Sequence, residues 1–453
     1  MEKYLNRTNL NFINQLFMLA LPIIFQNFLS ASMALMDTLM VGQLNETAIA
    51  AVGIANQFVF IFIVVQFGTH SGISIFTAQY WGQKDIASIK KLVGIGLMAG
   101  FTVCSLFTFV ALVIPDTMMA LYSKDTDVIR LGSGYLRIVG ISFVISVVSY
   151  TYRYSLRCMG VVKLPMYASM IAVPLNIVLN YILIFGKLGC PELGVNGAAI
   201  ATCISRFAEG FALVGIVYYK KYPIAAKISE MLDFDFPFFK KIFRTCWPVF
   251  LNELFWAIGI SLYSLVYARL GTESIAAVNI VASIENFMLI PFYGMFHAGA
   301  IIIGNTIGSG RDDDAYLYGK YLLILQFVMA IFAGAIMILS VDMILSFFKI
   351  SEGTYMNAHH LMFVAGAVLC FKITNFTNVI SVLRGGGDTR FGFLLDFTGI
   401  WCIGVPMAFF GAFFLHLPVY WGMALVATEE IYKLCIGIVR FSSRKWIRNL
   451  VKE

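Results

Sequence analysis

The feature that most restricts this chain is a series of twelve long apolar segments. About 20 mostly apolar residues are needed for a helix to cross the hydrocarbon layer of a membrane, and each segment reaches that length. Lipid offers no partner to an unpaired backbone N–H or C=O, so each segment must be helical. The sequence therefore predicts an all-α integral membrane protein with twelve transmembrane helices. They are expected at roughly 16–40, 48–76, 92–114, 131–151, 164–186, 194–219, 245–268, 275–304, 317–340, 358–382, 392–414 and 418–439.

The composition excludes a soluble protein. Hydrophobic residues make up 60% of the 453 residues and charged residues only 13%, whereas roughly a quarter of the residues in soluble domains are charged. A soluble fold has too little interior to hide so much apolar surface. The eight cysteines form no C-x-x-C pair and mostly lie in apolar runs, which predicts packing residues rather than disulfides or metal ligands.

The lysines and arginines indicate which side of the membrane each loop faces, because short cytoplasmic loops carry them in excess. Of the 32 basic residues, 23 fall on the side of the N-terminus, including Arg153, Arg157 and Arg384 in predicted loops. This predicts a multi-pass protein of the cytoplasmic (inner) membrane with both termini in the cytoplasm. No cleavage site follows a short apolar region, so the first helix is expected to be retained. The net charge of +7 reflects this topology, and no nucleic-acid partner is expected.

The two halves of the chain repeat one another. When Pro22 is placed on Pro248, the segment Pro22–Ile54 aligns with Pro248–Ile280 without a gap, and nine of 33 positions are identical. One further residue of offset places Arg157 on Arg384, and the preceding leucines also match. Such a repeat predicts one six-helix bundle in each half of the chain.

The repeat also sets the predicted domain organisation. Residues 1–219 are expected to form an N-terminal lobe, 220–244 a cytoplasmic linker, and 245–453 a C-terminal lobe with a basic tail. Six helices return the chain to the side where it started, which predicts two bundles related by a pseudo-two-fold axis along the membrane normal. Two such lobes around a cleft are typical of alternating-access transporters, for which a monomer suffices. A channel is disfavoured, because the sequence shows no ring of like charges and no filter-like loop.

Polar residues inside the predicted helices of the first lobe are candidates for an ion site, because such residues are costly in a membrane. Asp37 lies towards the outer end of the first helix, Asn176 and Asn180 share one face of the fifth, and Thr202 lies in the sixth. One carboxylate with neutral oxygens suits Na⁺, and a proton binds the carboxylate alone. We expect H⁺ or Na⁺ coupling here, with no other metal. A solvated helix end is the alternative for Asp37.

The second lobe carries more charge within its predicted helices. Glu253 and Glu285 are expected at similar depths near the membrane midplane, Lys372 comparably deep, and Asp396 near the inner end of the eleventh helix. These four residues are candidates for ion coupling or charge balance. A buried Glu–Lys pair that only fixes helix packing is the alternative.

Two other charged groups are interpreted as structural ion pairs. Arg206 and Glu209 are three residues apart on the sixth predicted helix, so they share one face. Glu429 and Glu430 with Lys433 are expected to form a similar pair near the inner surface.

Met33, Gln57, Phe60, Met288 and Tyr293 are candidates for the lining of a substrate cavity. Soft sulfur and aromatic side chains suit bulky organic cations. The alternative is simple packing, since Met and Phe stripes in membrane helices commonly face lipid or neighbouring helices.

Five segments resemble the multidrug and toxic compound extrusion (MATE) family of transporters. They are PIIFQNFLSASMALMDTLMVGQL (22–44), LRCMGVVKLPM (156–166), NIVLNYILIFG (176–186), GVNGAAIAT (194–202) and LRGGGDTR (383–390). The resemblance covers essentially the whole chain. It implies two six-helix bundles that form a V-shaped cavity, and export of organic, often cationic, compounds against inward H⁺ or Na⁺.

The resemblance also implies roles for individual residues. Asp37 matches the acid of the first helix that takes the proton or Na⁺, with Asn176 and Thr202 as its neighbours. Glu253 matches the acid of the seventh helix. Asn180 departs from the family pattern, which usually has Asp there, so the site has one carboxylate. A single carboxylate favours H⁺ over Na⁺ as the coupling ion, or places the coupling site in the second lobe.

We therefore expect a secondary active antiporter that exports organic, cationic and amphipathic compounds by alternating access of its two lobes. The sequence has no G-x-x-x-x-G-K-[ST] and no H-E-x-x-H motif, so an ion gradient is the expected energy source and no cofactor is expected. A flippase for a lipid-linked or peptide-like metabolite is the alternative on the same architecture. An enzyme is disfavoured, since no nucleophile–base or metal group is present.

Overall fold

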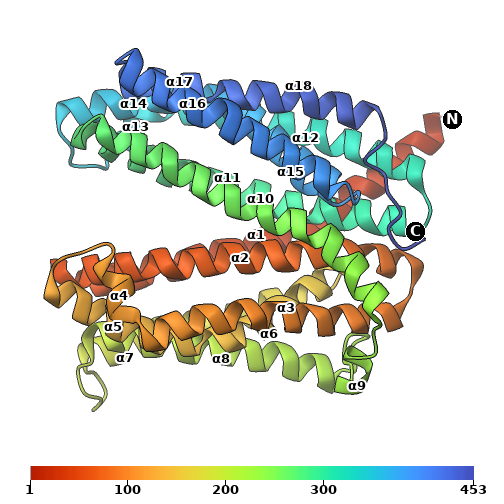
Figure 1. Cartoon of the computed structure of the whole chain (residues 1–453), viewed down its shortest axis with the longest axis horizontal. Helices are drawn as coiled ribbons and strands as arrows, with labels where there is room; N and C mark the ends of the chain where they lie inside the picture. The colour runs from red at the N-terminus through yellow and green to blue at the C-terminus, as the bar shows by residue number, and fades with distance from the viewer. Residues whose placement is uncertain (1, 453) are drawn as a thin grey trace. The chain divides into compact units, whose positions relative to one another are not determined.

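A computed structural model of the chain describes residues 2–452, with side chains from residue 11 onwards, and every regular element in that part is a helix. This confirms the predicted all-α class. The first nine helices are α1 (Glu2–Gly42), α2 (Glu46–Gln83), α3 (Ile86–Val113), α4 (Pro115–Ala120), α5 (Thr126–Ile141), α6 (Phe143–Cys158), α7 (Lys163–Phe185), α8 (Gly194–Tyr219) and α9 (Ile228–Met231). The others are α10 (Phe236–Arg269), α11 (Thr272–Gly308), α12 (Asp312–Leu339), α13 (Val341–Leu345), α14 (Glu352–Phe376), η1 (Thr377–Arg384), α15 (Thr389–Phe397), η2 (Thr398–Gly404), α16 (Val405–Phe409), η3 (Phe410–Phe414), α17 (Val419–Val426) and α18 (Thr428–Ser442) (Figure 1).

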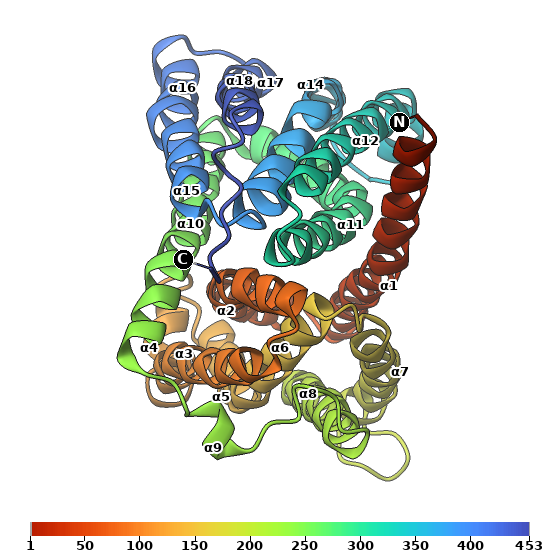
Figure 2. The same cartoon turned by 90° about the vertical axis from the view of Figure 1, so that its right-hand side faces the viewer.

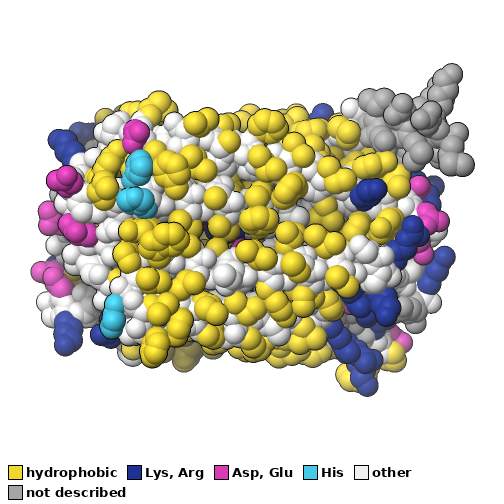
Figure 3. All heavy atoms as spheres, turned by 90° about the horizontal axis from the view of Figure 1, so that it is seen from above, with side chains coloured by type: hydrophobic (Ala, Val, Ile, Leu, Met, Phe, Trp, Pro, Cys, Tyr) yellow, Lys and Arg dark blue, Asp and Glu magenta, His cyan; other side chains and the backbone are white. Residues whose placement is uncertain are grey.

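The helices have the lengths that a membrane requires. By length and composition, ten described helices can cross a membrane, and an eleventh span is formed if α5 and α6, bent by 46°, count as one. The twelfth predicted segment, 418–439, is present as α17 and α18, separated at Ala427. Figure 3 shows hydrophobic side chains along the helices, and Lys, Arg, Asp and Glu towards their two ends. These features agree with a multi-pass membrane protein.

Three π-helical segments interrupt the second half of the chain. η1 directly continues α14, and η2 and η3 lie on either side of α16. π-Helical turns are rare and occur frequently at functional sites. η1 ends at Arg384, which pairs with one of the candidate acids described below.

The chain divides into two compact units, and each is described by itself. The first unit is Leu21–Phe243, and the second unit is Arg244–Glu453 together with Met1–Ala20. Compared with the predicted lobes, residues 220–243 of the linker belong to the first unit, and the first twenty residues belong to the second. The ring of Phe12 stacks on Tyr318 with centroids 4.7 Å apart, which explains the placement of the first residues.

The linker joins the first unit through contacts with α3. α9 lies beside α3 (Figure 2). Lys90 Nζ is 2.6 Å from Glu230 Oε1, and Gly94 leaves room for the backbone of Met231, which a β-carbon at that position would strike. These contacts tie the predicted linker to the bundle that precedes it.

Packing inside each unit follows the repeat. In the first unit α2 packs against α3 and α5, and in the second unit α11 packs against α12 and α14. The alignment of the two halves places α2 on α11, α3 on α12 and α5 on α14. The apolar core of the first unit centres on Phe58, Phe62 and Phe143, and the second unit has separate clusters around Tyr263 and around Phe296.

Candidate ion and substrate sites

The first unit contains a cavity of about 370 Å³ lined by α1, α2, α5, α6 and α8. Asp37 lies on its wall, as do Met33 and Phe60 from the predicted substrate lining. Gln57 is exposed and lies outside the residues that line this cavity. The helical spacing of Ser30, Met33 and Asp37 thus places one stripe of α1 against the cavity.

The four predicted polar residues of the first lobe lie together. Asn180 Nδ2 donates a hydrogen bond to Asp37 Oδ1, and Thr202 Oγ1 donates to Asp37 Oδ2 at 3.5 Å. Asn180 Nδ2 also lies 3.1 Å from Asn176 Oδ1, and Asn176 Nδ2 lies 3.5 Å from Thr202 Oγ1. Asn176, Asn180 and Thr202 are buried. The arrangement holds one carboxylate against neutral donors, with hydroxyl and amide oxygens near enough to complete a small cation site.

A second acid lies on the wall of the same cavity. Glu209 Oε1 is 2.7 Å from Arg153 Nη2 and accepts a hydrogen bond of 2.6 Å from Ser169 Oγ. The predicted Arg206–Glu209 pair is therefore wrong. Arg206 Nη1 instead donates to Ser142 Oγ at 3.0 Å, because neighbours on α6 and at its start reach both side chains. The cavity wall therefore carries two carboxylates and two guanidinium groups.

Two arginines expected in a loop lie within α6. Arg157 is buried, and its Nη2 donates to Gln26 Oε1 at 2.5 Å, while Gln26 Nε2 donates to Ser169 Oγ at 2.9 Å. A polar network thus runs from Arg157 through Gln26 and Ser169 to Glu209. The match of Arg157 with Arg384 in the repeat is the sequence signal that could have marked these positions.

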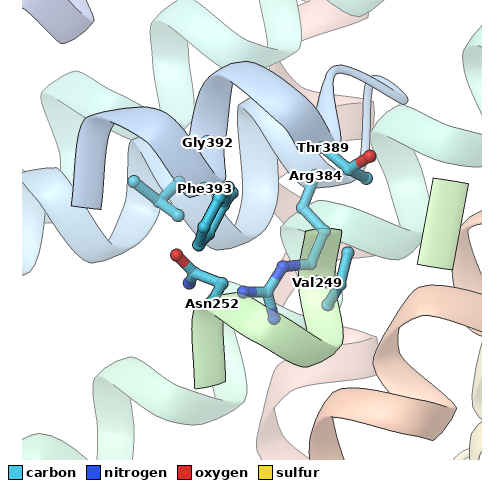
Figure 4. Close-up of a pocket in the computed structure, with 7 residues that line it drawn as sticks. Val249, Asn252, Arg384, Thr389, Gly392 and Phe393 are labelled. Carbon is cyan, nitrogen blue, oxygen red and sulfur yellow. The ribbon is translucent and has the colours of Figure 1, made fainter. Parts of the chain in front are cut away.

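In the second unit, Glu253 is bound by an arginine. Arg384 Nη2 lies 2.7 Å from Glu253 Oε1, and both side chains are buried. Figure 4 shows Arg384 and Asn252 on the wall of a small pocket between α10, η1 and α15, with Phe393 opposite. Asn252 Nδ2 donates to Asp396 Oδ2 at 3.0 Å. Glu253 is therefore one half of a buried ion pair, and Asp396 has a neutral partner.

Glu285 and Lys372 also form a pair, with Lys372 Nζ 2.9 Å from Glu285 Oε2. Both line a second cavity of about 270 Å³, and so does Tyr293. Met288 lies outside the residues that line this cavity and packs against the apolar cluster around Tyr263.

The predicted contact of Lys433 with Glu429 and Glu430 is confirmed. Lys433 Nζ is 3.4 Å from Glu429 Oε1 and 3.0 Å from Glu430 Oε1. All three residues line the same cavity as Glu285 and Lys372. The depth expected for them, near the inner surface, differs from the depth expected for Glu285, near the midplane, yet they line one cavity. The difference arises because nothing in the spacing along α18 shows which helices it faces.

Comparison with known proteins identifies the family. The MatE family model matches residues 22–182 and again residues 248–410, and the two matches begin at Pro22 and Pro248, the residues that the repeat aligns. The chain belongs to the MatE family. This confirms the resemblance found in the sequence.

Relatives of this MatE chain are named as transporters or resistance proteins. It is 23% identical over 439 residues to a probable multidrug resistance protein NorM of Thermotoga maritima, covering 96% of this chain and 94% of the relative. It is 27% identical over 422 residues to a probable multidrug resistance protein NorM of Bacillus cereus, covering 88% of each. Both names describe resistance proteins, and a further relative is named as a transporter.

Solved structures of transporters share the fold. A crystal structure of MATE in complex with MaL6 has a TM-score of 0.86 at 20% identity, covering 95% of this chain and 96% of that one. A MOP superfamily transporter from Pyrococcus furiosus, described as having a binding pocket of reverse polarity, has a TM-score of 0.85 at 19% identity, with the same coverage of both chains. At these identities the likeness concerns the fold alone.

Proposed function

We propose that this MatE protein is a secondary active antiporter of the cytoplasmic membrane. It exports organic, cationic and amphipathic compounds in exchange for inward H⁺ or Na⁺, by alternating access of its two units. The observation that carries the proposal is Asp37 on the wall of a cavity, held by Asn180 and Thr202. The naming of several relatives as multidrug resistance proteins supports the type of cargo.

The geometry around Asp37 explains how an ion and a cargo compete. An ionised carboxylate in a low-dielectric cavity strongly attracts a positive charge, and one positive charge is enough to neutralise it. A proton or Na⁺ on Asp37 therefore weakens the binding of an organic cation in the same cavity. Coupling follows if the free energy of ion binding differs between the inward-open and outward-open arrangements.

Aromatic and sulfur-containing side chains supply the part of the cavity wall that suits an organic cargo. Phe60, Tyr135 and Tyr150 line the cavity together with Met33. Aromatic faces attract organic cations, and methionine adapts to ligands of varied shape. Glu209 is held by Arg153, which leaves Asp37 as the acid of the cavity wall that, among the described residues, has no cation in contact with it. Arg206 lies on the same wall, where it donates to the neutral hydroxyl of Ser142.

The distribution of basic residues supports the proposed orientation. Of the 32 lysines and arginines, 23 lie towards one side in the topology read from the sequence, and 20 remain when Arg153, Arg157 and Arg384, which lie within α6 and η1, are left out. The cytoplasmic side carries such an excess. We therefore infer that both termini lie in the cytoplasm. The eight native cysteines are free, so they are first replaced by serine. Labelling of a single cysteine added at the C-terminus with a membrane-impermeant reagent, before and after lysis, then tests this orientation.

The decisive experiment is transport by the purified chain in proteoliposomes, with Asp37→Asn against the parent. The parent is expected to move a cationic dye when a H⁺ or Na⁺ gradient is imposed. Imposing one gradient at a time identifies the coupling ion as the one whose gradient drives dye transport. Asp37→Asn is expected to abolish gradient-driven transport, since the side chain no longer exchanges charge. Asp116→Asn is the matched control, because Asp116 is exposed and pairs with Arg137 outside the cavity. Gradient-driven transport by Asp37→Asn at the parental rate would overturn the proposal.

A further inference from the structure

The second unit holds more acids than bases in its interior and at its cavity wall. Apart from Asp388, which pairs with Arg440 and Arg448, the described side chains there comprise five carboxylates and three cations. The carboxylates are those of Glu253, Glu285, Asp396, Glu429 and Glu430, and the cations are Lys372, Arg384 and Lys433. A buried charge without a counter-charge is costly in a membrane protein. A positive ion taken up from outside the chain would compensate this excess of negative charge.

The excess of two negative charges has two sources. One is Asp396, whose hydrogen-bond partner is the neutral Asn252, and the other is the place where two glutamates share one lysine. Lys372 pairs with Glu285 and Arg384 with Glu253. Lys433 Nζ, by contrast, contacts both Glu429 and Glu430, at 3.4 and 3.0 Å, and the side chains of these three residues are between 5% and 10% exposed. Tyr263 donates its hydroxyl hydrogen to Glu429 Oε2, and Asn375 Nδ2 donates to Glu430 Oε2 at 2.6 Å. Two adjacent buried carboxylates with one ammonium group retain one proton between them most favourably.

The repeat gives an independent reason to regard this place as an ion site. The alignment of the two halves places Asp37 on Tyr263, Thr202 on Glu429 and Arg206 on Lys433. In the first unit the hydroxyl of Thr202 donates to Asp37. In the second unit the hydroxyl of Tyr263 donates to Glu429. The same acid–hydroxyl contact is thus present in both units, with the acid and the hydroxyl exchanged between the two helices.

We propose that Glu429 and Glu430 together bind one exchangeable proton, and that this pair, rather than Glu253, is the ion-coupling site of the second unit. The proposal rests on the proposed antiport function. The pair lines the cavity of about 270 Å³, so cargo in that cavity meets it directly. Other titratable or charged groups face the pair from every neighbouring element: Tyr263 and Tyr267 of α10, Glu285 of α11, Lys372 of α14, Asp396 of α15 and Lys433 of α18.

Glu253 is less suited to this role because of its partner. Its carboxylate lies 2.7 Å from Arg384 Nη2, and a proton on Glu253 would remove the negative charge that faces this buried guanidinium. A proton on the Glu429–Glu430 pair has the opposite effect, since it leaves one carboxylate opposite one ammonium. Release of that proton restores a net negative charge at the cavity wall, and an organic cation in the cavity then compensates it.

Infrared difference spectroscopy of the purified full-length protein tests the proposal without any cargo. The carbonyl stretch of protonated carboxyl groups is recorded as the pH is changed. Glu429→Gln and Glu430→Gln are each expected to remove the same part of this signal, because each leaves one glutamate paired with Lys433. Glu285→Gln is the matched control, since Glu285 has its own lysine, and it is expected to keep that part. A signal that both Glu429→Gln and Glu430→Gln retain in full would overturn the proposal.

A binding experiment separates this proposal from the antiport function. Tetraphenylphosphonium is added to the detergent-solubilised protein, and the number of protons released per bound cation is measured. Both single variants are expected to release one proton fewer than the parent, whereas unchanged release would contradict the site. A parent that neither binds nor transports any organic cation refutes the antiport function, and the spectroscopic result then still decides whether the pair holds a proton.

Discussion

Asp37 of the first unit and the glutamates Glu253 and Glu285 of the second unit are held in different ways. In the first unit Asp37 is held by an amide and a hydroxyl, both neutral. In the second unit Glu253 and Glu285 are each held by a cation. A carboxylate with neutral partners gains or loses a positive ion without disrupting an ion pair, whereas a carboxylate bound to arginine does not. The repeat therefore preserved the backbone while the chemistry of the two units diverged.

Arginines at equivalent positions show the same divergence. Arg157 and Arg384 occupy matching places in the repeat, and each reaches back to the helix that opens its unit. Arg157 donates a hydrogen bond to the amide oxygen of Gln26, and Arg384 donates one to the carboxylate of Glu253. The contact fastens two helices in both units, but only in the second does it neutralise an acid.

The largest effect is expected from breaking the ion pair of the second unit. Arg384→Gln leaves Glu253 buried without a counter-charge, which is expected to lower stability by about 3–5 kcal/mol. Thermal unfolding in detergent measures the loss. Arg384→Gln combined with Glu253→Gln is expected to recover most of it, since no charge then remains. A single variant as stable as the parent would show that water or lipid headgroups reach Glu253.

The helices and the repeat were predictable because lipid leaves few alternatives. An apolar run of about 20 residues has to be a helix, and the match of Pro22–Ile54 with Pro248–Ile280 is visible in the letters of the sequence. The spacing of Asn176 and Asn180 correctly placed both on one face. That this face meets Asp37, through the hydrogen bond from Asn180, was implied only by resemblance. Contacts between helices are not encoded in the spacing along any one of them.

The ion pairs were the least predictable part of the site. Arg206 and Glu209 share a face of α8, yet Glu209 pairs with Arg153 from α6, because a closer partner on another helix outcompetes a neighbour on the same one. The three glycines that follow Arg384 favour a loop, but η1 carries this arginine into the interior. The grouping of residues 1–20 with the second unit likewise depends on Phe12 meeting Tyr318, a contact between distant segments.

An intermediate effect is expected from the two equivalent hydroxyl groups. Tyr263→Phe removes the hydroxyl that donates to buried Glu429, and hydrogen bonds to charged groups contribute about 1.5–3 kcal/mol. Thr202→Val removes a longer bond of 3.5 Å to Asp37, for which about 0.5–1 kcal/mol is expected. Unfolding of both variants in detergent measures the difference. Equal losses would mean that the two contacts are equivalent in strength as well as in position.

The smallest effect concerns the linker, which only the first unit carries. The ammonium group of Lys90 donates to Glu230 and, with the backbone N–H of Lys227, lowers the pKa of that carboxyl below its usual value. A carboxyl whose pKa is lowered in the folded protein stabilises it above the usual pKa and ceases to do so as the pH falls through the lowered one. The contact between α9 and α3 that the Lys90–Glu230 pair makes is therefore expected to weaken only at acidic pH. Hydrogen exchange of residues 228–231 should rise at low pH in the parent relative to that of distant loops, and Glu230→Gln should show the raised exchange already at neutral pH. Because Glu230 is exposed, the change is expected to remain local, and a shift in the unfolding temperature of the whole chain would contradict this assignment.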